Sequence, residues 1–208
     1  MINTNRIFLE LTMQVNALKF GNFTLKSGKK SSFFFNISAF LESGYLSELA
    51  DLYAQAIIES ACEYDVVFGP AYKGIPLAAA VSTKLSQKLL EPVSVCFDRK
   101  EEKDHGEGGA LVGSVKDKKV LIIDDVLTAG TALKSSINLI NQHKGVVSAA
   151  IVALDRQERE EGLHVSTILE EQLKIPIYSI SNLENLISFL ESNDKKDLAE
   201  SLKSSLKE

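Results

Sequence analysis

The chain has 208 residues, of which 45% are hydrophobic, and it carries a formal net charge of −5. This length and apolar content suit one buried core, so we expect a single domain over residues 1–208. The acidic balance argues against a nucleic-acid partner, and no apolar run approaches the length that spans a membrane. Cys62 and Cys96 lie far apart without metal-ligand spacing, which favours reduced thiols and a cytoplasmic protein.

Residues 1–40 contain the signals of one helix and one hairpin. Apolar residues recur at helical spacing and predict an amphipathic helix that ends near Gly21. Aromatic and β-branched residues at 23–25 and 33–37 predict two strands joined by the turn 26–29. We expect this hairpin to form a small hood lobe beside the main sheet. The helical positions are Ile7, Leu11, Val15 and Leu18.

Residues 60–180 alternate short apolar runs with helical patterns, after a helix with apolar positions from Leu46 to Ile57. This alternation predicts an α/β fold with a doubly wound parallel sheet as its core. Residues 181–208 are expected to add closing helices at 182–190 and 194–206, the last of them exposed because it is rich in Lys, Glu and Ser. The expected strands cover 66–68, 93–97, 120–123, 149–154 and 177–180.

The segment 120–131 combines a strand, two adjacent acids and a loop of small residues. Its four leading apolar residues predict a strand covered on both faces. Asp124 and Asp125 follow at the carboxyl end, where open parallel sheets bind ligands. The small residues 128–131 allow backbone N–H groups to close around phosphate oxygens at the start of the next helix.

The two carboxylates would repel a phosphate, so we expect them to face another part of the ligand. Aspartates accept hydrogen bonds from a ribose diol, and their charge favours positive charge on a nearby anomeric carbon. The segment therefore predicts a site for a phosphorylated sugar. The alternative is a strand that ends in Asp-Asp and is followed by an ordinary turn. The two acids alone, or the small-residue loop alone, would favour this alternative.

Two further loops suit the same ligand. The 69–74 loop follows a predicted strand at the same sheet edge, and its amides and Lys73 suit pyrophosphate; the alternative is a routine strand-to-helix turn. Residues 99–109 are densely charged and end in glycines. They suit a mobile lid that brings cations to a departing pyrophosphate and excludes water, whereas the alternative is a solvated hairpin loop.

Four residues elsewhere suit a flat anionic ring. Lys26 lies on the hairpin turn, Phe34 and Phe35 could supply aromatic and backbone contacts, and Arg156 could pair with a carboxylate. Singly, each has an ordinary explanation as a core or solvated residue. Together they describe a pocket.

These segments resemble the type I phosphoribosyltransferases and, among them, the orotate phosphoribosyltransferases. The resemblance rests on residues 23–28, 34–36, 69–74, 99–108, 120–131 and 155–156, in order and approximate spacing. It implies the type I phosphoribosyltransferase fold and transfer of ribose 5-phosphate from phosphoribosyl pyrophosphate to orotate in pyrimidine biosynthesis. It also implies Mg²⁺ held by substrate oxygens and water, with no dedicated metal ligands, and a homodimer whose subunits share the 99–109 loop.

The resemblance further implies roles for individual residues. Catalytic roles fall to Lys103, His105, Asp124 and Asp125. The orotate site would comprise Lys26, Phe34, Phe35, Thr128 and Arg156. The phosphoribosyl pyrophosphate site would comprise Lys26, Tyr72, Lys73, Arg99, Lys100, Lys103, His105, Asp124, Asp125, Val126, Leu127, Thr128, Ala129, Gly130, Thr131 and Ala132.

Two other functions remain alternatives. A purine-salvage phosphoribosyltransferase would share the 120–131 segment, but Phe34, Phe35 and Arg156 disfavour it. A regulator that senses phosphoribosyl pyrophosphate and binds nucleic acid should carry a basic face, and this chain is acidic. One departure from the family is visible: Ser32 and Phe33 stand where Pro-Tyr is frequent, which is expected to loosen the hairpin.

Overall fold

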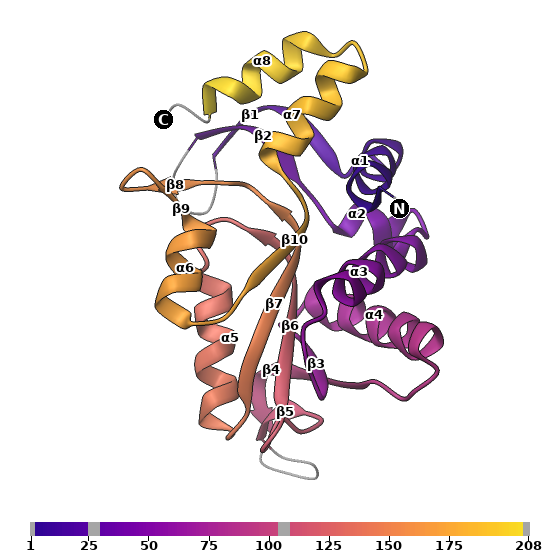
Figure 1. The fold of residues 1–208 in the computed structure, drawn as a ribbon, viewed down its shortest axis with the longest axis vertical. Helices are drawn as coiled ribbons and strands as arrows, with labels where there is room; N and C mark the ends of the chain where they lie inside the picture. Colours follow the sequence, from indigo (N-terminus) through magenta and orange to yellow (C-terminus); the bar gives the residue numbers. More distant parts are fainter. Residues whose placement is uncertain (1–2, 25–29, 104–108, 206–208) are drawn as a thin grey trace.

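The protein is built around a six-stranded sheet with the strand order β10-β7-β6-β3-β4-β5 (Figure 1). The structure is a computed structural model, and it describes residues 3–24, 30–103 and 109–205, with side chains except those of 100–103, 204 and 205. The strands pair in parallel except β4 with β5, which confirms the predicted doubly wound α/β sheet. Their bounds are β3 Val66–Gly69, β4 Ser94–Lys103, β5 Gly109–Val112, β6 Lys119–Leu127, β7 Val146–Asp155 and β10 Ile177–Asn182.

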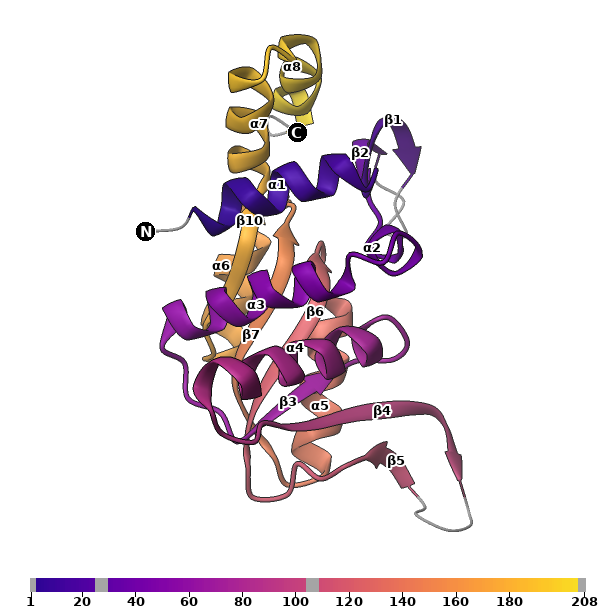
Figure 2. The same ribbon diagram turned by 90° about the vertical axis from the view of Figure 1, so that its right-hand side faces the viewer.

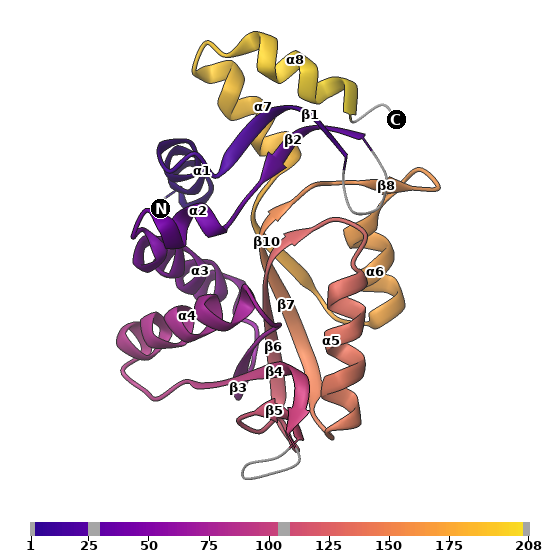
Figure 3. The same cartoon turned by 180° about the vertical axis from the view of Figure 1, so that it is seen from behind.

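Helices cover both faces of this sheet, with α3 and α4 on one face and α5 and α6 on the other (Figures 1 and 3). Alternate residues along β6 point to opposite faces of the sheet and pack in the two separate cores. Leu121 and Ile123 of β6 belong to the core beneath α3 and α4, whereas Val120 and Ile122 belong to the core beneath α5 and α6. A continuous apolar run therefore forms the strand. The bounds are α3 Leu46–Ser60, α4 Gly74–Leu89, α5 Thr131–Gln142 and α6 Val165–Leu173.

The predicted hairpin is confirmed: β1 (Leu18–Thr24) pairs antiparallel with β2 (Lys30–Phe35). The first helix ends earlier than predicted. Helix α1 covers Thr4–Gln14, and Asn16 takes a left-handed φ of 55°, so that Leu18 starts β1 instead of continuing the helix to Gly21. Leu18 fits the helical spacing but is buried as a strand residue. The short helix α2 (Ser38–Glu42) follows the hairpin.

The closing helices are α7 (Leu183–Ser192) and α8 (Lys196–Ser205). The prediction that the last helix is exposed is wrong for one of its faces, because Ala199 and Leu202 are 0% exposed. Helix α8 contacts α7 and lies against β2, so the hood contains both early and late parts of the chain (Figure 1). A small hairpin of β8 (Arg159–Glu160) and β9 (Leu163–His164) follows β7. Within the described ranges, no helix is both long and apolar enough to cross a membrane.

Candidate active site

The site is built at the carboxyl ends of β6, β3 and β7, beside the hood. Hairpin β1-β2 and hairpin β4-β5 project from the same side of the sheet core (Figure 2). Strand β6 is longer than predicted and continues through both aspartates to Leu127. The acids therefore stand on a paired strand, because Asp124 lies beside Val152 of β7 in the ladder. A strand holds their backbone more firmly than a loop would.

Asp124 is held in place by two hydrogen bonds. Its carboxylate accepts from the backbone N–H of Asp125 at 2.9 Å, and its backbone carbonyl accepts from the Tyr53 hydroxyl at 2.7 Å. Burial and the charge of Asp125 raise the pKa of Asp124 to about 7, although that N–H and the charge of Lys73 act in the opposite direction. Burial, Asp125 and Asp124 also raise the pKa of Tyr53, so its hydroxyl stays protonated and remains a donor.

The loop after β6 brings backbone amides to the start of α5. Gly130 is its N-cap and takes a left-handed φ of 72°. A Cβ at Gly130 would lie 2.3 Å from Cδ1 of Leu169 on α6, so only glycine fits this packing. Thr128 is partly buried, while Ala129, Thr131 and Ala132 are exposed. The side chains of Val126 and Leu127 pack in the two cores, so these residues can offer a ligand only their backbone.

The 69–74 loop lies next to the aspartates. Lys73 Nζ is 3.6 Å from Asp125 Oδ2, with 48% of the lysine side chain exposed. Glycines at both ends allow a tight turn, since a Cβ at Gly69 would lie 2.1 Å from the carbonyl oxygen of Gly74. Asp98 of the neighbouring strand β4, one residue beyond the last pairing of β4 with β3, accepts a hydrogen bond of 2.5 Å from the Ala71 N–H. Tyr72 is 70% exposed.

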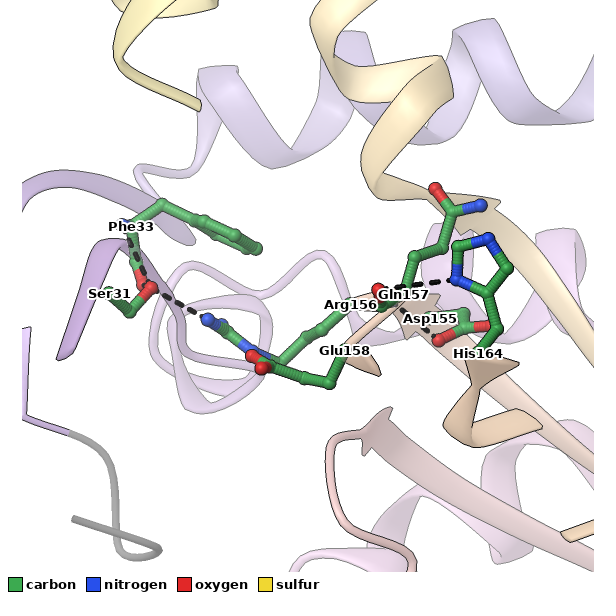
Figure 4. A network of polar contacts seen from close by, with 7 residues as sticks. All are labelled: Ser31, Phe33, Asp155, Arg156, Gln157, Glu158 and His164. Atoms are coloured by element: carbon green, nitrogen blue, oxygen red, sulfur yellow. Dashed lines mark hydrogen bonds and ion pairs between the residues drawn. The ribbon is translucent and has the colours of Figure 1, made fainter. Parts of the chain in front are cut away.

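Arg156 follows β7 and lies beside the loop that joins β6 to α5. Its backbone N–H donates to the carbonyl of Leu127 at 3.1 Å, which joins the ends of β7 and β6. Its guanidinium donates from Nε to Glu158 at 3.2 Å and from Nη2 to the Ser31 hydroxyl at 2.6 Å, and it lies over the ring of Phe33, 4.1 Å from the centroid (Figure 4). Burial lowers the pKa of Arg156, while Glu158 counteracts the shift.

The two phenylalanines predicted for the ring pocket point to opposite sides of β2. Phe34 is 38% exposed, and its ring lies 5.8 Å from that of Phe23. Phe35 is 4% exposed and its ring packs on Phe8 in the core, so only its backbone could meet a ligand. Phe33, on the buried face, is the ring that meets Arg156.

The remaining predicted residues belong to the turn and the charged loop. Lys26 and His105 lie outside the described residues, as do the side chains of Lys100 and Lys103. Arg99 lies on β4, and its Nη1 donates to the carbonyl of Gly109 on β5 at 3.4 Å. Strands β4 and β5 pair antiparallel on both sides of the 104–108 segment, so the charged run belongs to a hairpin.

Sequence reasoning missed four residues that support the site. They are Ser31 and Phe33 next to Arg156, Tyr53 beneath Asp124, and Asp98 beside the 69–74 loop. Tyr53 fitted a helical apolar pattern, which gave no sign of its polar contact. Asp98 does follow the apolar run 93–97, beyond which β4 no longer pairs with β3, and that position could have identified it.

Three comparisons with known proteins extend this description. A model of the phosphoribosyl transferase domain matches residues 40–177. The orotate phosphoribosyltransferase of Kluyveromyces lactis is 49% identical over 193 residues, covering 88% of this chain and 85% of that protein. The orotate phosphoribosyltransferase of Salmonella typhi is 44% identical over 199 residues, covering 95% of this chain and 92% of that protein. The crystal structure of orotate phosphoribosyltransferase from Francisella tularensis aligns with a TM-score of 0.82 and 38% identity, covering 95% of this chain and 96% of that one.

Proposed function

This chain belongs to the orotate phosphoribosyltransferase family, and we propose that the site at the ends of β6, β3 and β7 carries out that family's reaction. The reaction moves ribose 5-phosphate from phosphoribosyl pyrophosphate to a ring nitrogen of orotate. The products are orotidine 5-phosphate and pyrophosphate, in the de novo synthesis of pyrimidine nucleotides.

The observation that best supports this function is that the two aspartates and the loop leading into α5 lie together at the carboxyl end of β6. The ribose diol would lie against Asp124 and Asp125, and the 5-phosphate would lie against the backbone of residues 128–132. The negative charge of the aspartates favours positive charge that grows on the anomeric carbon. The residues of β6 and its loop thus bind and orient the sugar.

The leaving pyrophosphate would lie against the 69–74 loop. Lys73 lies 3.6 Å from Asp125, so a cation is already present where charge develops. Tyr72 is exposed beside it, and Arg99, Lys100, Lys103 and His105 would approach from the charged hairpin. Among these, Lys103 and His105 are the proposed catalytic partners of the aspartates, because they can donate to departing oxygens.

The orotate ring would lie between the hood and the end of β7. Arg156 would pair with its carboxylate, and Phe34, the Phe35 backbone, Lys26 and Thr128 would complete the pocket. Support comes from the position of Arg156, whose backbone bonds to Leu127 immediately before Thr128. The ring and the sugar thereby meet at one loop.

Mg²⁺ is the proposed cofactor. In the described part of the chain, no group of three His, Cys, Asp or Glu side chains could hold a metal ion. The carboxylate of Asp125 is an oxygen donor, and 16% of its side chain is exposed next to Lys73. This donor set fits an ion held mainly by substrate oxygens and water, which would supply positive charge to the pyrophosphate when bound.

We further propose a cytoplasmic homodimer in which residues 99–109 complete the partner subunit's site. The family resemblance supports this assembly, and hairpin β4-β5 projects from the core in a way that could reach a neighbour (Figure 2). Cys62 and Cys96 are free thiols, which suits a reducing compartment.

An ultraviolet assay tests the reaction. Orotate absorbance should fall only when phosphoribosyl pyrophosphate and Mg²⁺ are both present, and an Asp124→Asn, Asp125→Asn double variant should lose most of this rate. Turnover of a purine base with no consumption of orotate would instead indicate a salvage enzyme. Binding of phosphoribosyl pyrophosphate without turnover of any base would indicate a sensor.

A further inference from the structure

The guanidinium of Arg156 is fixed by three residues from two parts of the fold, and we call Ser31, Phe33 and Glu158 the Arg156 clamp. Ser31 and Phe33 come from β2 of the hood, whereas Glu158 follows β7 (Figure 4). Arg156 and Phe33 are 4% and 1% exposed, and Ser31 is 7% exposed. The clamp is therefore a buried contact between the hood and the sheet core.

The direction of each hydrogen bond in the clamp follows from chemistry. The Ser31 hydroxyl has one proton, and the Phe33 carbonyl 2.8 Å away can only accept it. The hydroxyl oxygen is left to accept from Nη2 of Arg156 at 2.6 Å and from the Phe33 N–H at 3.2 Å. Ser31 is thus an oriented acceptor that the backbone of its own strand holds in position.

This arrangement sets the plane and rotation of the guanidinium. The Phe33 ring covers one face, Glu158 accepts a hydrogen bond from Nε, and Ser31 accepts one from Nη2. A guanidinium has five N–H donors, more than these two bonds use, so donors remain for a ligand carboxylate. Arginine side chains lose rotamer entropy when they are fixed, and the clamp imposes this loss before the ligand arrives.

We propose that Ser31 is a positioning residue for the carboxylated pyrimidine ring, acting through Arg156. This inference rests on the proposed function, in which Arg156 pairs with the carboxylate of orotate. Without the Ser31 acceptor, the guanidinium keeps its charge but not its rotation. Recognition of the carboxylate then weakens, while the site for phosphoribosyl pyrophosphate is unaffected.

The test compares two buried serines that each make a 2.6 Å hydrogen bond. Ser31→Ala removes the clamp acceptor, and Ser82→Ala removes a hydroxyl on α4 that donates to the Val93 carbonyl just before β4. We expect Ser31→Ala to raise the KM for orotate about tenfold, with the KM for phosphoribosyl pyrophosphate changed less than about twofold. Ser82→Ala should leave both KM values unchanged and serves to measure the loss of thermal stability that any such substitution causes.

A double variant separates positioning from a structural role. In an Arg156→Ala background, Ser31→Ala should raise the KM for orotate by no more than about twofold, because its effect passes through the arginine. Full additivity with Arg156→Ala, or an equal rise of both KM values, would overturn the proposal. If Ser31→Ala does not fold, Phe33→Leu tests the same clamp, and an unchanged orotate KM in that variant would overturn it. A wild-type protein that does not consume orotate refutes the proposed function instead.

Discussion

The Tyr53 hydroxyl joins α3 to the end of β6 by donating to the Asp124 carbonyl. Tyr53→Phe removes the donor and leaves a partly buried carbonyl with one bond fewer, so we expect a loss of about 1–3 kcal/mol in the free energy of unfolding. Urea titration measures this value. Tyr45→Phe is the matched control, because its hydroxyl accepts a hydrogen bond from the exposed Gln14 amide and its loss should cost less than about 0.5 kcal/mol. Equal losses in the two variants would contradict a special role for Tyr53.

Protonation of Asp124 should make stability depend on pH. An aspartate in an unfolded chain has a pKa of about 3.9, whereas burial and Asp125 raise the pKa of Asp124 to about 7 in the folded protein. Between these values the folded state binds more protons than the unfolded state, so this group lowers stability as pH rises through the window. The penalty is absent below the lower value and complete above the upper one.

Asp124→Asn removes that penalty. The melting temperature of this variant, compared with wild type, should therefore improve steadily from about pH 4 to about pH 7 and change little above that range. Differential scanning calorimetry at several pH values measures the difference. Asp51→Asn removes an exposed carboxylate that pairs with Lys88, and it controls for the change in net charge. A difference between Asp124→Asn and wild type that stays constant with pH would refute the assignment.

Individual site residues could be predicted where the chain itself places them at a strand end. Asp124, Asp125 and Lys73 each follow an apolar run, and the carboxyl ends of parallel strands meet at one sheet edge. Ser31 and Tyr53 could not be predicted, because their partners lie 125 and 71 positions away in the chain. The opposite orientations of Phe34 and Phe35 follow from strand alternation and could have been read from the pattern.

The turn from β6 into α5 depends on close packing against α6. Gly130→Ala would place a methyl group 2.3 Å from Leu169 and also strain a left-handed φ. Gly44→Ala is a matched control, because its φ is 81° and nothing lies within 4 Å of a Cβ there. By denaturant titration, we expect the control to lose about 1 kcal/mol in the free energy of unfolding and Gly130→Ala to lose about 1–3 kcal/mol more. Gly130→Ala should also raise the KM for phosphoribosyl pyrophosphate. Equal losses would show that α6 does not constrain the loop.

Helix α8 should contribute to stability through its buried face. Leu202 is fully buried in the core that includes the hood, so Leu202→Ala should cost about 2–5 kcal/mol in the free energy of unfolding. Leu163→Ala on the β8-β9 hairpin, where the leucine is 53% exposed, should cost less than about 0.5 kcal/mol. Chemical denaturation of both variants provides the comparison. A Leu202→Ala protein as stable as the control would mean that α8 is not firmly docked.

At the level of elements, periodicity predicted the strands better than the ends of helices. The sheet strands carry apolar runs that suit burial on both faces, and all five predicted ones are present. The end of α1 was wrong because Leu18 fits a helical repeat and a strand equally well. The buried face of α8 went unnoticed because Leu198, Ala199 and Leu202 are few among charged neighbours, and their partner β2 is distant in the chain.

The proposed sharing of the 99–109 loop can be tested by mixing two defective proteins. If the loop completes the partner's site, a dimer of one Lys103→Ala subunit and one Arg156→Ala subunit contains one intact site. Random exchange should then restore about a quarter of wild-type activity, because half of the dimers are mixed and each has one working site. The same treatment applied to each variant alone controls for refolding. Failure to regain activity after verified exchange would argue for a loop that serves its own subunit.

The hood joins segments that lie at opposite ends of the described chain, and this order affects how the protein folds during synthesis. The apolar face of hairpin β1-β2 leaves the ribosome early, but α8, which covers β2, follows only after every strand of the sheet has been translated. In a nascent chain, the part of this apolar face that α8 covers therefore stays exposed for most of elongation, and a chaperone could bind there. Stalling translation between β10 and α7 should trap that surface in its open form.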